Sequence, residues 1–384
     1  MKMARTLACA ATIGIAPSVA DAEERDGPGL DVQVAYTMDV FFVDPGAGKS
    51  STDYLDNLDL IADADLERIA GWRGARAHLY GLVNLGGRPN DRAGTLQGIN
   101  NIEVSRQAAR LFEAWLEQDI GPRTSVLAGL YDLNSEFYAN DAAGLLIAPA
   151  FGIGTELSAT GPNGPSIFPS TALAIRVNQT IGKTGYARAA LFNANARTLG
   201  DRRGIDTAFR DGALAIAEGG IEGRHKLALG LWRYTKRQDD VLLGNAAPRK
   251  AQGAYVLAET PVVEREDGLS LRLFLRAGIS DGKTTPFRGG WQAGLLATHV
   301  LPTRPDSALT FGANEVWLSR GYRAQMAADG LRPARAERAF ELSYSDTLAT
   351  WLTVQPDVQW IIRPGGERDR SSAWVAGLRT TLAF

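Results

Sequence analysis

The sequence predicts an all-β protein, a transmembrane antiparallel β-barrel of about 16 strands with short periplasmic turns and long external loops. Two observations lead to this prediction. Apolar and polar residues alternate along many short segments. The connections between those segments alternate between short and long. With 384 residues and 45% hydrophobic residues, the chain is long enough for one large barrel and too polar for a bundle of membrane helices.

The first 22 residues have the three parts of a signal peptide. Lys2 and Arg5 supply a positive start, a short apolar stretch follows, and Ala20-Asp21-Ala22 fits a cleavage site. Cleavage would also remove Cys9, the only cysteine, so the mature chain would form no disulfide. We therefore expect a cleavable signal peptide over 1–22 and export to the outer membrane of a Gram-negative bacterium. A single barrel domain would then cover 23–384.

The charge of the chain is nearly balanced. It has 41 basic and 43 acidic residues, and loss of the signal peptide would leave 39 and 42, a net charge of -3. A charge this small argues against a nucleic-acid partner. The three histidines, His78, His225 and His299, do not have the spacing of metal ligands. We expect no metal site and no cofactor.

Residues 57–67 show the strand pattern most clearly. Leu or Ala occupies every second position, and Asn, Asp or Glu occupies the positions between them except at Ile61. An alternation with period two indicates a strand with one apolar face. The segments with this pattern are 31–42, 54–66, 74–85, 109–119, 123–132, 170–178, 184–193, 212–220, 225–235, 252–262, 269–279, 290–300, 308–318, 338–346, 351–363 and 373–384.

The connections between these segments differ in length according to their position. Those after even-numbered segments are short: 67–73, 120–122, 179–183, 221–224, 263–268, 301–307 and 347–350. Those after odd-numbered segments are mostly longer: 86–108, 133–169, 194–211, 236–251 and 319–337, with shorter ones at 43–53, 280–289 and 364–372. A soluble sandwich has no reason to alternate in this way, whereas outer-membrane barrels do. The even count would place both termini on the periplasmic side.

The two faces of the strands should therefore meet different solvents. A barrel of this size encloses an aqueous lumen, so its polar face is expected inside and its apolar face against outer-membrane lipid. The chain ends with Phe384 on an alternating strand. A terminal Phe in this position resembles the signal that the outer-membrane assembly machinery recognises. Lipid and this machinery are the expected macromolecular partners.

Three stretches resemble the carbohydrate-selective porin (OprB) family: 340–384, 111–137 and 166–177. The first carries the most specific motif, with Gln355-Pro356-Asp357, then Arg363-Pro364-Gly365-Gly366, and a terminal Phe384. The resemblance implies a porin for passive diffusion of small sugars, monosaccharides such as glucose. It leaves the sugar and the oligomeric state open.

The selectivity of a passive channel depends on its width and on the side chains at its narrowest point. The longest connection, 133–169, is the candidate pore constriction if it folds into the lumen. Its candidate residues are Asn134, Phe137, Tyr138, Asp141 and Glu156. The pore-lining or substrate-contacting candidates lie on polar strand faces and are Glu113, Trp115, Glu117, Arg176, Arg188, Arg272, Arg276, Gln355, Asp357, Gln359 and Arg379.

Other interpretations of the sequence stay open. Charged residues in a lumen often pair with each other and only brace the wall. An excess of arginine in the lumen would favour a general or anion-leaning diffusion porin. A barrel enzyme or an adhesin is a third class, but no nucleophile motif supports catalysis, so we expect a protein that is not an enzyme.

Overall fold

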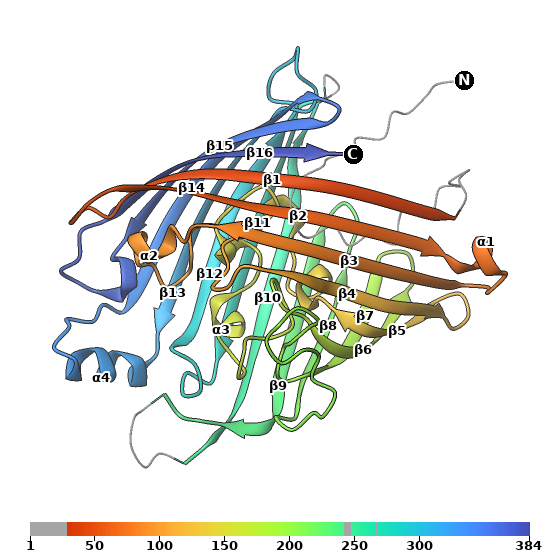
Figure 1. Ribbon diagram of the computed structural model, residues 1–384, viewed down its shortest axis with the longest axis horizontal. Coiled ribbons are helices and arrows are strands. Elements are labelled where there is room, and N and C mark those ends of the chain that lie inside the picture. The colour runs from red at the N-terminus through yellow and green to blue at the C-terminus, as the bar shows by residue number, and fades with distance from the viewer. Residues whose placement is uncertain (1–28, 242–246, 266–267) are drawn as a thin grey trace.

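The computed structural model describes residues 29–241, 247–265 and 268–384, so the predicted signal peptide lies outside the described residues. Within these ranges, sixteen antiparallel strands form one closed barrel, in which β1 (Leu30–Asp44) pairs with β16 (Ala373–Ala383) (Figure 1). The other strands are β2 (Ser51–Asp65), β3 (Ala75–Gly86), β4 (Ala108–Asp119), β5 (Thr124–Tyr131), β6 (Ala172–Ile181), β7 (Gly185–Asn193), β8 (Ala213–Ile221), β9 (Lys226–Gln238), β10 (Arg249–Glu264), β11 (Ser270–Ser280), β12 (Phe287–Thr298), β13 (Ala308–Leu318), β14 (Ala336–Ala349) and β15 (Leu352–Ile362). The fold class is confirmed, and each predicted strand ends within three residues of the observed one.

The barrel has one end with short turns and one with long loops, as predicted. β14 and β15 are joined by 350–351 alone, whereas 132–171 joins β5 to β6. Both described ends of the chain lie at the short-turn end, where the N–H of Phe384 donates to the carbonyl of Val34 at 2.9 Å. In outer-membrane barrels the short turns face the periplasm, so the long loops mark the external end.

The outer surface of the barrel is apolar. On β9 the residues Leu227, Leu229 and Leu231 are exposed, while the alternate residues such as Ala228 and Trp232 are buried. An apolar outward face around a closed barrel is what lipid requires, because closure leaves no strand edge with unpaired backbone groups. The alternation in the sequence therefore arises because one face of each strand contacts lipid and the other faces the lumen.

Helices are few and short in the described ranges. They are α1 (Leu66–Ala70), α2 (Asn90–Ala93), α3 (Thr155–Ser158) and α4 (Arg320–Ala328), together with the 3₁₀ turns Leu133–Ser135, Asp141–Ala143, Pro149–Phe151 and Pro364–Gly366. None of these described helices combines the length and the apolar character that a membrane span needs. The 3₁₀ turns at 133–151 belong to the longest connection, which determines the shape of the interior.

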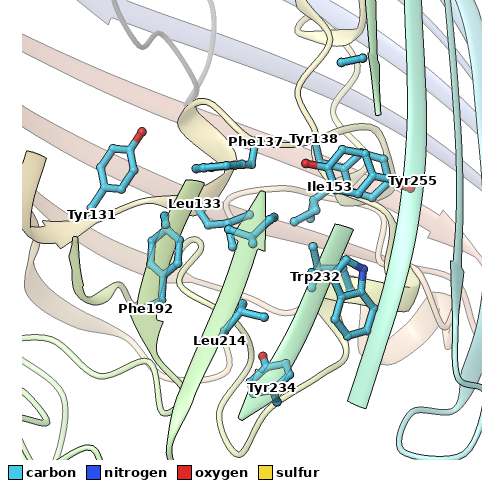
Figure 2. Packing of buried hydrophobic residues seen from close by; sticks show 14 of the residues in the cluster. Tyr131, Leu133, Phe137, Tyr138, Ile153, Phe192, Leu214, Trp232, Tyr234 and Tyr255 are labelled. Atoms are coloured by element: carbon cyan, nitrogen blue, oxygen red, sulfur yellow. The ribbon is translucent and has the colours of Figure 1, made fainter. Parts of the chain in front are cut away.

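The connection 132–171, here called the inner loop, packs against the inside of the barrel. Figure 2 shows Phe137 and Tyr138 of this loop among Trp232 and Tyr255 of the wall. The rings of Tyr138 and Tyr255 stack with their centroids 3.9 Å apart. Side chains of the loop are thus part of the buried core, and the loop narrows the lumen.

Candidate functional site in the barrel interior

Glutamates on the inner face of the wall hold the backbone of the inner loop. Each accepts hydrogen bonds from loop N–H groups: Glu113 from Asp132 at 2.9 Å, Glu218 from Tyr138 at 2.9 Å, Glu259 from Ala142 at 2.9 Å, and Glu341 from Ile147 and from Ala148, the latter at 3.0 Å. These glutamates lie on β4, β8, β10 and β14, so the loop is fixed from several sides of the barrel. A carboxyl group offers two oxygens as acceptors, so one glutamate can hold one or two loop N–H groups.

Arg276 of β11 donates hydrogen bonds to carbonyl groups of the inner loop. Its side chain is fully buried. It donates to the carbonyl of Tyr138 at 2.9 Å, to that of Gly152 at 2.6 Å and to that of Ala150 at 3.2 Å, and it also donates to Phe151. The planar guanidinium can serve several acceptors at once, so one arginine fixes the 138–152 stretch of the loop.

Glycines on the inner face make room for the loop. A Cβ at Gly278 would lie 1.9 Å from Oε1 of Glu156 and 2.2 Å from the hydroxyl of Tyr138. A Cβ at Gly312 would lie 2.6 Å from a methyl group of Leu146. Neither glycine has a positive φ, so close approach of the loop is the reason for these residues.

Glu156 is a fully buried carboxyl group in α3 of the inner loop. The hydroxyl of Tyr138 donates to it at 2.9 Å. Burial in a site without full charge compensation penalises the ionised form and raises the pKa of Glu156 to about 7. This loop therefore carries a group that titrates near neutral pH.

A second connection, 87–107, also enters the barrel mouth. Arg379 of β16 forms a bidentate pair with Asp39 of β1 at 2.9 and 2.7 Å, and it donates to Asn101 of the connection at 2.7 Å. Gln359 donates to the carbonyl of Ile99 at 2.8 Å. Like the inner loop, this connection is thus held by polar residues of the wall.

The pairs on β4, β6 and β7 connect the wall with the start of the inner loop. Arg176 contacts Glu117 at 2.9 Å and Glu136 of the loop at 2.8 Å. Arg188 donates to the carbonyl of Glu136 at 3.0 Å. Trp115 stacks on His78 with a centroid distance of 4.9 Å. Each cation here has a partner, as expected for charges that brace a wall.

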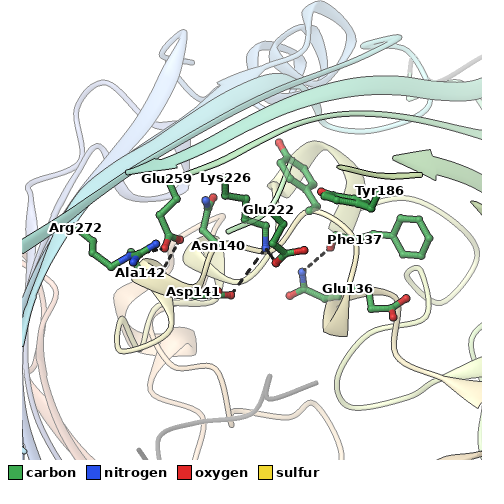
Figure 3. Close-up of polar contacts among 12 residues, drawn as sticks. Glu136, Phe137, Asn140, Asp141, Ala142, Tyr186, Glu222, Lys226, Glu259 and Arg272 are labelled. Atoms are coloured by element: carbon green, nitrogen blue, oxygen red, sulfur yellow. Dashed lines mark hydrogen bonds and ion pairs between the residues drawn. The ribbon is translucent and has the colours of Figure 1, made fainter. Parts of the chain in front are cut away.

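A further group of paired charges, part of it exposed to solvent, lies beside the loop (Figure 3). The side chain of Asp141 is 80% exposed and faces Lys226 at 3.9 Å, and Lys226 also contacts Glu222 at 3.0 Å. Arg272 remains 31% exposed and pairs with Glu259 at 2.9 Å. This set of charges has both signs, and Asp141 is its most exposed member.

The sequence candidates now have definite places. The wall candidates lie on the inner face, and several of them hold loops: Arg276, Gln355 through the carbonyl of Leu145 at 2.6 Å, Gln359 and Arg379. Asp357 is buried beside Gln359, which donates to it at 2.9 Å. Of the loop candidates, Phe137, Tyr138 and Glu156 are buried, Asn134 is half-buried and bonds to the carbonyl of Phe137 at 3.2 Å, and only Asp141 projects into water.

Sequence reasoning missed several residues of this interior. Glu218, Glu259 and Asp39 occupy polar positions of alternating strands, so the alternation could have identified them as lumen residues. The inward course of 87–107 carries no comparable signal, because the segment has neither periodicity nor a distinctive motif. It had been assigned only as a long external loop.

An apolar outer face, a polar interior and a loop folded into the lumen together define the class of diffusion porins. Within this class, the chain belongs to the carbohydrate-selective porin (OprB) family, whose model matches residues 49–384. Porin B of Pseudomonas aeruginosa is 23% identical over 92% of this chain and 86% of its own length. The putative porin QuiX of Acinetobacter baylyi is 22% identical over 88% of this chain and 85% of its own length.

The fold comparison agrees with the family. The high-pH structure of OprB from Pseudomonas putida matches with a TM-score of 0.84 over 93% of this chain and 94% of that one, at 23% identity. The protein is thus an outer-membrane porin of the carbohydrate-selective family, and its barrel indicates a channel.

Proposed function

We propose that this porin lets neutral monosaccharides such as glucose diffuse passively beside the inner loop. Membership in the carbohydrate-selective family supports the solute class. The observation that carries the proposal is a set of paired charges beside the inner loop. Asp141, Glu222 and Arg272 are partly exposed to solvent, and the buried Lys226 contacts both Asp141 and Glu222. Carboxylates accept from sugar hydroxyls, and ammonium and guanidinium groups donate to them. Because positive and negative side chains are both present, such a lining strongly favours neither cations nor anions.

Liposome swelling with the purified protein tests this proposal. Glucose should enter faster than a zwitterionic amino acid and faster than glucuronate, which has a similar size and a negative charge. Asp141→Ala and Arg272→Ala should each reduce the preference for glucose. Glu315→Gln serves as the matched control, since Glu315 lies on the outward face and pairs there with Arg338. Equal swelling rates for all solutes would contradict the sugar preference.

An anion-leaning porin is the second candidate. Arg335, Arg363 and Arg368 line a hollow of about 420 Å³ among the external connections, and such a basic mouth would concentrate anions. The zero-current potential across a KCl gradient distinguishes the two functions. A value near zero supports the sugar channel, and a clear anion preference that is lost in Arg363→Gln supports the second candidate. A protein that forms no conducting pore would instead fit an enzyme or an adhesin.

The signal peptide is part of the same proposal. Export through the inner membrane would remove 1–22 and leave Glu23 as the first residue. N-terminal sequencing of the protein from outer-membrane fractions tests this, and a chain that retains Lys2 would contradict it.

A further inference from the structure

The lipid-facing surface of the barrel has an apolar groove across β6 to β11. Its volume is about 810 Å³. Small outward residues form its floor, namely Ala189, Ala215, Ala217 and Ala254. Larger ones form its sides, namely Ile175, Leu191, Leu231 and Ile279. A run of small residues between bulky ones is the physical origin of the groove, and acyl chains are the apolar groups available at this depth.

The external end of the groove is basic. On β9 the exposed leucine stripe ends with Arg233, which lines the groove, and Arg237 follows four residues later on the same strand. Lys250 of β10 is the register partner of Arg237, and Gln252 is that of Arg233. All three cations are exposed and lie at the end of β9 and β10 from which the long loops emerge, with a β-bulge between Lys250 and Gln252.

These cations differ from two other outward arginines at the same end, which have a carboxylate or an aromatic ring as partner. Arg338 on β14 forms an ion pair with Glu315, and Arg288 on β12 lies over the ring of Trp317 at 5.4 Å. Among the described residues, no carboxylate pairs with Arg233, Arg237 or Lys250; Arg237 donates only to the carbonyl of Pro248, at 3.1 Å. Asp281, at the rim, accepts bonds from Thr284 within its own turn.

We propose that this groove binds a phosphate-bearing lipid of the outer leaflet, with acyl chains against the alanine floor and phosphate at Arg233, Arg237 and Lys250. The tails alone give little selectivity, because lipid tails are as apolar as the leucines that they contact. The headgroup determines which lipid is bound, because basic residues near the membrane surface attract anionic lipid. The site is separate from the solute path, since the named floor, side and headgroup residues are exposed or half-buried on the outside of the barrel wall.

Native mass spectrometry of the purified full-length porin tests the proposal, with diphosphoryl lipid A, phosphatidylglycerol and phosphatidylcholine added in equal amounts. Lipid A should be retained most, phosphatidylglycerol less and phosphatidylcholine least. Arg233→Gln should weaken lipid A retention about fivefold, and the triple variant with Arg237→Gln and Lys250→Gln should remove the preference. Filling the floor with Ala215→Leu and Ala254→Leu should reduce retention while the three cations remain.

Arg338→Gln is the matched control, because it removes an outward arginine that already has a carboxylate partner. Heat-modifiable mobility on gels verifies that each variant forms a folded barrel. Equal retention of the three lipids by the wild type would overturn the proposal. It would also fail if Arg338→Gln lowered lipid A retention as much as Arg233→Gln does. Glucose swelling should stay unchanged in all these variants, which separates this site from the proposed transport function.

Discussion

A buried arginine is stable only when its N–H groups find acceptors, and Arg276 finds them on the inner loop. Its contacts are backbone carbonyls of 138–152, whereas a carboxylate is the usual partner. Each buried carbonyl in turn needs a donor. The arginine and the loop therefore depend on each other, and a residue predicted from the sequence as a sugar ligand holds the inner loop in place.

Replacing this arginine should release the loop. Arg276→Met keeps most of the side-chain volume but leaves the loop carbonyls without donors, at about 1–3 kcal/mol for each buried group. We expect faster hydrogen exchange in 138–152, a larger single-channel conductance and a weaker preference for glucose. Arg338→Met is the control on the outer face. Unchanged exchange in the loop would show that Arg276 does not fasten it.

A second prediction for single residues concerns the glycines of the inner face. Gly278→Ala adds a methyl group 1.9 Å from Glu156, so the end of the loop must move. The conductance should rise, and overpacking of this kind typically costs about 1–3 kcal/mol. Gly81→Ala is the matched control, because its nearest contact is a backbone oxygen at 3.8 Å. Equal single-channel conductance in the two variants would contradict the role given to Gly278.

At the scale of elements, the strands were predictable and the loop paths were not. A strand such as β9 has lipid on one side and the lumen on the other, so its alternation appears in the sequence itself. The acceptors of Arg276 lie more than a hundred residues earlier in the chain and are backbone atoms, which any residue type provides. The pattern identified Arg276 as a lumen residue, but it could not show that a loop covers it.

The inner loop should respond to pH as one element. Burial raises the pKa of Glu156 to about 7, so the docked loop binds this proton more tightly than a released loop would. Its docking is strongest below about pH 4.5 and weakens by roughly 3 kcal/mol as the pH rises to about 7. The protection factors of the loop amides, which correct hydrogen exchange for the intrinsic rate at each pH, should be lower at pH 8 than at pH 4.5, and the single-channel conductance should be higher.

Two variants separate this response from other titrations. Glu156→Gln copies the neutral form and should reduce the change of the inner loop's protection factors between pH 4.5 and pH 8. Glu103 lies on the other inward connection, and burial raises its pKa to about 7 as well. Glu103→Gln should leave the pH response of the inner loop intact. A pH response that persists in Glu156→Gln would contradict the assignment.

At the scale of the whole molecule, the barrel is complete only when its last strand meets its first. The register of β1 with β16 runs from Ala35 with Ala383 to Asp44 with Trp374. Arg379 and Asp39 add a buried ion pair across the same seam. The side chain of Phe384 takes no part in this closure, since Phe384 is 75% exposed and only its backbone bonds to Val34.

Loss of the Phe384 ring should therefore affect assembly in cells but not refolding of the purified protein. Phe384→Ala keeps the backbone bonds to Val34, so refolding of the purified protein into detergent micelles should proceed at the wild-type rate. In cells the same variant should accumulate outside the outer membrane, because the terminal ring is the feature that the assembly machinery would recognise. Arg379→Ala should have the opposite effect. It leaves the buried Asp39 without its cation, so refolding of the purified protein should be slower than in the wild type. Equal amounts of Phe384→Ala and wild-type protein in the outer membrane would show that assembly depends on the closed seam and not on the terminal ring.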